Sequence, residues 1–162
     1  MLPEGLYDIE IFEKPVISAL KERYKNIDVY TEFPDHKKIE PGIYAEVVAF
    51  GLSGEEPDSG ETELDVEWEV RIVLPVTNEN KRVVKQISVD ISNLVQNNHF
   101  DSETVISKFV RASDDRIDLT NHKAEVWLVE FFQRVRVGPI KTDPIEDFLE
   151  FTGEIEGGVA HD

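Results

Sequence analysis

The sequence predicts an α+β fold, a mainly antiparallel sheet with two principal helices packed on one side. One observation is the run 64–74, where apolar and polar residues alternate with a period of two. A second is the β-prone run 124–137, and a third is a pair of segments, 7–25 and 78–96, with apolar residues at helical spacing. The chain of 162 residues, 40% of them hydrophobic, is long enough for one domain with a proper core.

The first helix is expected within 7–25, with Asp8 as its N-cap. Pro15 lies inside this segment, so the helix is either kinked there or begins near Glu13. A short strand is expected at 27–30, followed by a connecting loop to residue 42.

The central hairpin is expected next. The run 43–50 is apolar almost throughout, as in a strand covered on both faces. Residues 51–60 contain three glycines and a proline and form the connection. In the strand 64–74, one face is acidic and the other is directed into the core; the core residues are Leu64, Val66, Trp68, Val70, Ile72 and Leu74.

The second helix is expected over 78–96, capped by Asn78 and ended by Asn97-Asn98. A short strand follows at 105–110, and a polar connection then contains Asp114, Asp115 and Asp118. The strand 124–137 closes the domain at Gly138-Pro139. We therefore expect one domain over 1–140.

An acidic extension is expected over 141–162. Asp143-Pro144 is typical of a helix start, and the short helix would end at Phe151. Its apolar face must dock on its own domain or on a neighbour, so the candidate docking residues are Ile145, Phe148, Leu149 and Phe151.

The charge is strongly negative and unevenly placed. The chain has 34 acids and 17 bases, a formal net charge of −17. Residues 55–69 hold eight acids and residues 142–162 hold seven, with no base in either, which leaves 19 acids against 17 bases elsewhere. This balance argues against a nucleic-acid or anionic-membrane binder with a basic face. A host with a salty cytoplasm would also explain the acidity.

No membrane partner is expected either. No apolar run approaches the ~20 residues of a membrane helix, and the first five residues do not resemble a signal peptide. We expect a soluble protein that acts inside the cell.

Catalytic and cofactor motifs are absent from the sequence. There is no cysteine, the four histidines are far apart, and no phosphate-binding, dinucleotide-binding or nucleophile-elbow motif occurs. We expect no cofactor and no metal. Asp65, Glu67 and Glu69 stand about 7 Å apart in successive pairs on one strand face, which could suit glycoside hydrolysis or a divalent cation. A solvated face or a subunit contact is the commoner role of such a row.

Two sets of charges suggest self-assembly. We expect the acids Asp65, Glu67 and Glu69 and the bases Arg134 and Arg136 to give the subunit opposite charges on its two sides, which suits a head-to-tail ring. The alternative is that these charges only face water.

The order of these segments resembles the phage tail terminator family, also called tail completion proteins. The resemblance covers residues 6–138. It rests on the opening Leu6-Tyr7-Asp8-Ile9-Glu10, the helix ending near LKERY, the strand pair running into Leu74-Pro75, the helix to Leu94, and the closing strand VWLVEFFQ, residues 126–133.

The resemblance implies a non-enzymatic virion protein. It would form a homohexameric ring on the tail tube, stop tube polymerisation and join the tube to neck or head-completion proteins, with DNA passing through the lumen. Its location would be the virion tail, and the host cytoplasm during assembly. The segment from Lys141 onward departs from the shortest family members; it could contact a neighbouring subunit, a neck protein or a tail sheath.

Two alternatives remain open. One is another neck or tube joint of a phage or contractile secretion apparatus. The other is an enzyme that uses Asp65, Glu67 or Glu69.

Overall fold

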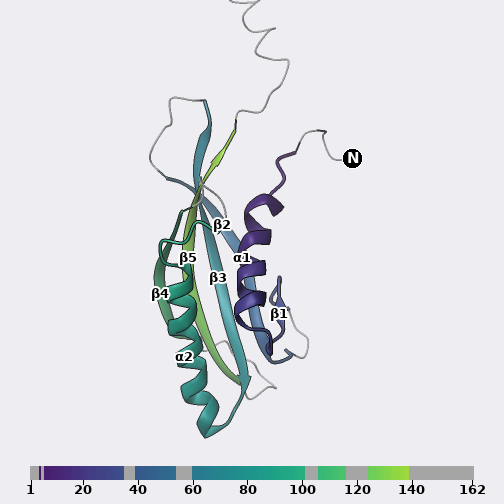
Figure 1. Cartoon of the computed structure of the whole chain (residues 1–162), viewed down its shortest axis with the longest axis vertical. Helices are drawn as coiled ribbons and strands as arrows, with labels where there is room; N and C mark the ends of the chain where they lie inside the picture. The colour runs from purple at the N-terminus through teal and green to yellow at the C-terminus, as the bar shows by residue number, and fades with distance from the viewer. Residues whose placement is uncertain are drawn as a thin grey trace, which may run out of the picture.

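The computed structural model describes residue 4 and residues 6–34, 39–53, 60–100, 106–115 and 124–138. These described residues form two helices and five strands (Figure 1). In chain order these are α1 (Glu10–Arg23), β1 (Val29–Tyr30), β2 (Gly42–Leu52), β3 (Thr62–Pro75), α2 (Asn78–Val95), β4 (Ile106–Asp114) and β5 (Ala124–Val137). The predicted C-terminal helix, Asp118 and three of the four histidines lie outside the described residues.

The sheet has the strand order β1-β2-β3-β5-β4. Only β1 and β2 pair in parallel, and every other neighbouring pair is antiparallel. Both helices cover the same face, because residues of α1, α2 and the central strands share one core cluster (Figure 1). The predicted α+β class with helices on one side is confirmed.

The alternating strand is the centre of this core. Val66, Val70 and Ile72 are fully buried and Trp68 nearly so, while Leu64 and Leu74 pack against the cluster half-buried. The helices contribute Phe12, Val16, Leu20, Val84, Ile87, Ile91 and Val95. Burying each large apolar side chain contributes about 1.5–3 kcal/mol, so this face holds the sheet and helices together.

The opposite face is covered only at one end. Tyr44, Val73 and Val126 form a second buried cluster there, against which Tyr30, Phe33 and Ile39 pack. The rest of this face carries charged side chains together with Leu128 and Phe132. It is called the open face below.

The ends of both helices differ from the sequence expectation. α1 begins at Glu10, so the prediction of a start near Glu13 is wrong and Pro15 lies in the helix interior. Asp8 is not the N-cap residue, although its Oδ1 accepts a 3.0 Å hydrogen bond from the Glu10 N–H, one of the amides that a helix start leaves free. In α2 the cap is Thr77 and not Asn78, because Thr77 Oγ1 accepts from the Asn80 N–H at 2.9 Å.

The strands β2 and β4 also differ from the sequence expectation. β2 is buried only over Gly42–Ala45, and Val48, Phe50 and Leu52 are exposed. The expectation of a strand covered on both faces is therefore wrong for its second half. β4 extends to Asp114, so Asp114 lies in a strand and not in a connection.

Candidate interaction surface

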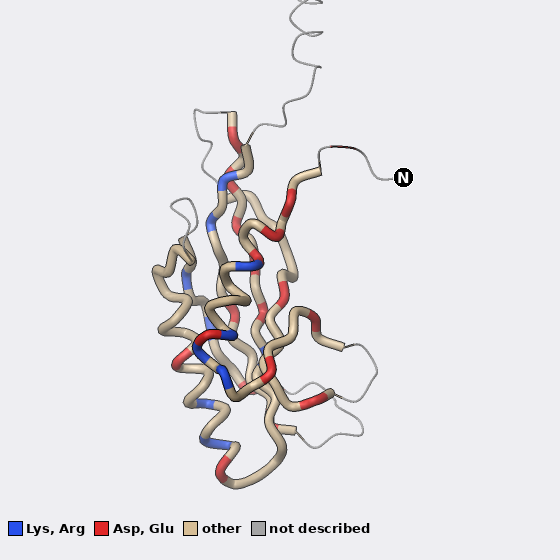
Figure 2. Tube along the Cα trace, turned by 45° about the vertical axis from the view of Figure 1, so that its right-hand side comes forward, with Lys and Arg blue, Asp and Glu red and all other residues tan. Residues whose placement is uncertain are grey.

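The predicted interface charges lie together on the open face. Asp65 and Arg134 are directly opposite each other in the β3–β5 ladder, and Arg134 Nε lies 3.1 Å from Asp65 Oδ1. Glu63 and Arg136 are opposite in the same way, with Arg136 Nε 3.2 Å from Glu63 Oε2. The expectation that acids and arginines occupy opposite sides of the subunit is wrong, because the antiparallel register makes them neighbours. Figure 2 shows acidic and basic residues interleaved along the described chain.

Glu63 connects these pairs. Its side chain is only 4% exposed and lies 3.5 Å from Arg134 Nε as well as beside Arg136. A 2.8 Å hydrogen bond from Ser53 Oγ, together with the two guanidinium groups, lowers the pKa of Glu63 below its ordinary value. Glu63 thus stays ionised and holds both arginines on the open face.

A second charged cluster surrounds Arg71 at the other end. The Arg71 side chain is 14% exposed and contacts Glu69 at 2.7 Å, Asp115 at 2.9 Å and Glu46 at 3.5 Å. Its guanidinium carbon also lies 4.9 Å above the centre of the Phe33 ring. This cluster ties β2, β3, Phe33 and Asp115 together.

The three candidate acids therefore differ in their surroundings. Asp65 and Glu69 each bind an arginine, whereas Glu67 is exposed and faces Phe132 across the ladder. Among the described residues, no group of three or more His, Cys, Asp or Glu side chains could hold a metal ion. Two of these three carboxylates are bound in ion pairs, and this is the arrangement of a polar surface.

The edge of β2 is a feature that the sequence analysis missed. β1 pairs with β2 only at Ile43 and Tyr44, so residues 47–52 have no neighbouring strand on that side within the described chain. The Ile43 N–H donates to Asp28 O on the β1 side, and backbone groups alternate in direction along a strand. Val47 therefore directs its N–H and C=O to the open edge. Exposed strand edges of this kind readily pair with another chain.

The start of the other sheet edge is covered. The Ser107 N–H donates to Asn98 O and the Ser107 C=O accepts from the Asn97 N–H. The Phe109 N–H donates to Gln96 Oε1 at 2.8 Å, and a bulge between Phe109 and Arg111 interrupts the ladder. The turn after α2 thus covers the start of β4, whereas the described residues place no such cover along residues 47–52 of β2.

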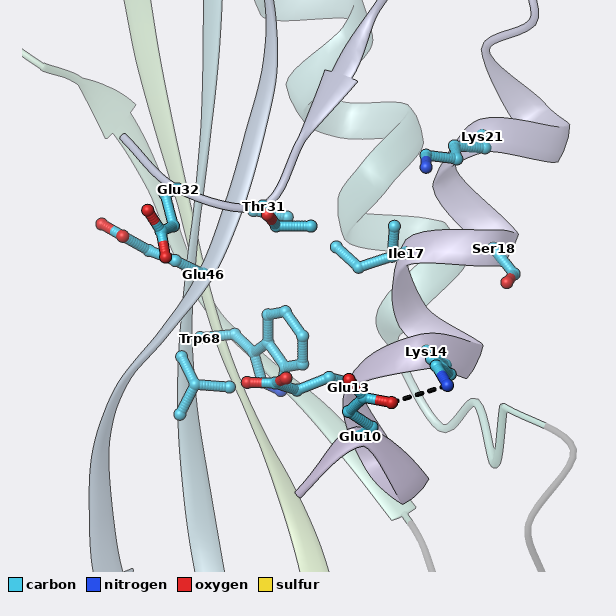
Figure 3. Close-up of a pocket in the computed structure, with 12 residues that line it drawn as sticks. Glu10, Glu13, Lys14, Ile17, Ser18, Lys21, Thr31, Glu32, Glu46 and Trp68 are labelled. Atoms are coloured by element: carbon cyan, nitrogen blue, oxygen red, sulfur yellow. Dashed lines mark ion pairs between the residues drawn. The ribbon is translucent and has the colours of Figure 1, made fainter. Parts of the chain in front are cut away.

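An open groove of about 440 Å³ runs between α1 and this β2 edge (Figure 3). Ile17 and Trp68 contribute apolar atoms, while Glu13, Glu32 and Glu46 make much of its wall acidic. Partial burial, and then Glu10 and Asp8, raise the pKa of Glu13 above its ordinary value. Figure 3 shows Lys14 turned to Glu10, with which it forms an ion pair of 2.6 Å. The groove is acidic and lies beside free backbone groups.

The predicted docking residues Ile145, Phe148, Leu149 and Phe151 lie outside the described residues. None of the described helices is long and apolar enough to cross a membrane.

Comparisons with known proteins show the fold. No family model matches the sequence, and no curated protein matches it. A chain from the virion of a native gene transfer agent particle has a similar structure, with a TM-score of 0.52 and 13% identity. The match covers 78% of this chain and 93% of that one. A second solved chain is 17% identical, and the match covers 79% of this chain and 92% of that one. Its TM-score of 0.48 is too low for an inference about the fold.

Proposed function

We propose that this protein is a structural subunit of a phage-like particle. The observation that carries the proposal is the fold shared with a gene transfer agent virion chain, almost all of which is matched. A structural role also agrees with the site, where Glu63, Asp65 and Glu69 on the open face are bound by arginines.

The specific role we propose is that of a tail terminator. In this role six copies form a ring that caps the tail tube, stops its polymerisation and contacts neck or head-completion proteins. The order of segments over residues 6–138 supports this role, and the fold class expected from that order is the observed one. The virion tail is then its location after assembly in the host cytoplasm.

The available β2 edge supports assembly through unlike surfaces. A ring needs two different patches on each subunit, because a single patch that pairs with itself stops at a dimer. One sheet edge is open along residues 47–52 of β2 and the other is covered at the start of β4, so the two sides of this subunit differ.

The test is direct imaging of the purified protein. Mass photometry between about nanomolar and micromolar concentrations gives the mass of the assembly, and negative-stain electron microscopy gives its symmetry. A six-fold ring supports the proposal. A stable monomer at every concentration, or a ring of another symmetry, contradicts the terminator role.

A second experiment adds the purified protein to polymerising tail tube subunits. A terminator ring should shorten the tubes and be found at one end of each. If tubes grow to unchanged length in a several-fold excess of the protein, the proposed role at the tube is wrong.

A further inference from the structure

An exposed apolar patch lies at the end of the sheet where β5 finishes. It consists of one residue at the start of α1 and two at the end of β2, and it is called the apolar end patch: Ile9, Phe50 and Leu52. Leu52 is 81% exposed, Phe50 53% and Ile9 43%. Large apolar side chains are seldom left exposed in a group of this kind, so the patch needs a cover.

The members of the patch come from two elements that lie close together. The rings of Phe12 and Phe50 are 6.3 Å apart in an edge-to-face contact, which places the first turn of α1 against β2. Ile9 precedes Phe12 by three residues, one helical turn, and therefore points to the same side. Figure 1 shows the start of α1 and the end of β5 toward the same end of the sheet.

We propose that residues 145–151 of this chain cover the apolar end patch of their own subunit. Ile145, Phe148 and Leu149 fall at the i, i+3, i+4 positions of one helical face, with Phe151 just beyond. Such a face fits an exposed apolar surface by burying its own side chains. The inference does not depend on ring assembly or on the tail terminator role.

The segment between Gly138 and Ile145 is long enough for residues 145–151 to reach the apolar end patch. Leu52 pairs with Leu64, and Leu64 pairs with Val135 on β5. Two strand spacings separate β2 from β5, and Gly138 lies three residues beyond Val135, so Gly138 is roughly 14 Å from Leu52. Seven extended residues from Gly138 to Ile145 span up to about 24 Å. The linker therefore covers the distance with slack.

The same linker favours the subunit's own segment over one from another copy. A short flexible tether gives an effective concentration of about millimolar, well above the working concentration of a second copy. The acids Glu146, Asp147 and Glu150 lie between and after the apolar residues of this segment. Asp8 and Glu10 flank Ile9 of the patch, so the two surfaces carry like charges. The docking energy is thus apolar, and added salt strengthens docking by screening these like charges.

The test uses the absence of cysteine from the chain. In the full-length variant Leu52→Cys/Phe148→Cys, a short bis-maleimide should link the two positions within one chain. The product is a monomer of altered mobility, formed to the same extent at about 0.1 µM and about 10 µM protein, because linking within one chain does not depend on concentration. The matched control is Val89→Cys/Phe148→Cys, since Val89 is exposed on α2 and outside the patch.

A within-chain link at least several-fold more abundant than in the control supports the proposal. Links only between chains, rising with concentration, show that a second copy supplies the segment and overturn it. Equal linking in both variants also overturns it. Amide hydrogen exchange in the otherwise native chain gives an independent readout: Phe148→Asp should speed exchange of residues 48–52, and unchanged exchange contradicts the proposal.

Discussion

The indole Nε1–H of Trp68 donates a 2.7 Å hydrogen bond to the side-chain Oε1 of Gln133, and both side chains are buried in the core. The Trp68 ring also stacks on Phe131, with 5.7 Å between ring centres. Within the described part of the chain, Gln133 Nε2 has no hydrogen-bond partner. A buried amide that is only half satisfied makes this position sensitive to change.

Trp68→Ala should lower the free energy of unfolding by about 3–5 kcal/mol, because it removes a large buried ring and opens a cavity. It also leaves the whole Gln133 amide without its partner. Urea denaturation followed by circular dichroism measures the loss. An unchanged unfolding midpoint would contradict the position of Trp68 in the core.

The hydrogen bond can be separated from the packing by a double-mutant cycle. Trp68→Phe and Gln133→Leu each leave one buried polar group without its hydrogen-bond partner. Each should lower the free energy of unfolding by about 1–3 kcal/mol beyond the effect of the changed packing. The double variant removes both partners, so its cost should be smaller than the sum. Simple additivity would mean that the bond contributes nothing.

Asp90→Asn should weaken the tie between the two helices. Arg23 Nε and Nη2 lie 2.9 and 2.7 Å from the two carboxylate oxygens of Asp90, and Tyr24 also donates to it. The hydrogen bonds from Arg23, and then from Tyr24, lower the pKa of Asp90 below its ordinary 3.8. Asp90 thus contributes stability above pH 4, and this contribution is lost as the pH falls through the lowered pKa.

Melting temperatures of wild type and Asp90→Asn from pH 7 down to pH 3 check this. The variant should melt a few degrees lower at neutral pH, and the gap should narrow as the solution becomes acidic. Ser92→Ala on the same helix is a control that leaves the ion pair intact. A gap that is constant with pH contradicts the role of the Asp90 charge.

The charge-swapped variant Asp65→Arg/Arg134→Asp tests whether the open face is a subunit contact. The swap keeps opposite charges facing each other across the β3–β5 ladder, so the subunit should stay folded. The single change Arg134→Glu instead places a third acid beside Glu63 and Asp65, and it should destabilise the subunit. We predict that the swap weakens oligomers at low salt, as measured by mass photometry. Since exposed pairs contribute only about 0–1 kcal/mol each, the effect depends on repetition around an assembly. Oligomers of normal stability would exclude these residues from the interface.

No binding to duplex DNA is expected at physiological salt. Affinity for DNA comes largely from bases that neutralise phosphates, and this chain has a formal net charge of −17. Fluorescence anisotropy with a labelled duplex at about 150 mM salt checks it, repeated at low salt to expose any weak contact. Saturable binding in the micromolar range contradicts the prediction.

The sequence predicted most of the fold because periodicity reports burial directly. The alternation around Trp68 gave the core face of β3, and β5 was expected with its observed bounds. Helix caps depend on local geometry, and Thr77 and Asn78 are both good capping residues, so composition could not separate them. The pairing of Asp65 with Arg134 could not be predicted, because it follows from the order β3-β5 between strands far apart in sequence. The open edge of β2 is likewise a property of its neighbours, and its only signal is the shortness of the run 27–30.

The difference between the two sheet edges limits how far this protein can aggregate through strand pairing. Amyloid-like growth requires every added chain to present a fresh edge for the next one. Here the turn 96–98 binds the backbone at Ser107 and Phe109, so a chain captured at its β2 edge presents a partly covered edge on its other side. Repeated strand addition is therefore hindered at the start of β4. The second half of β2 meanwhile stays available for a specific partner.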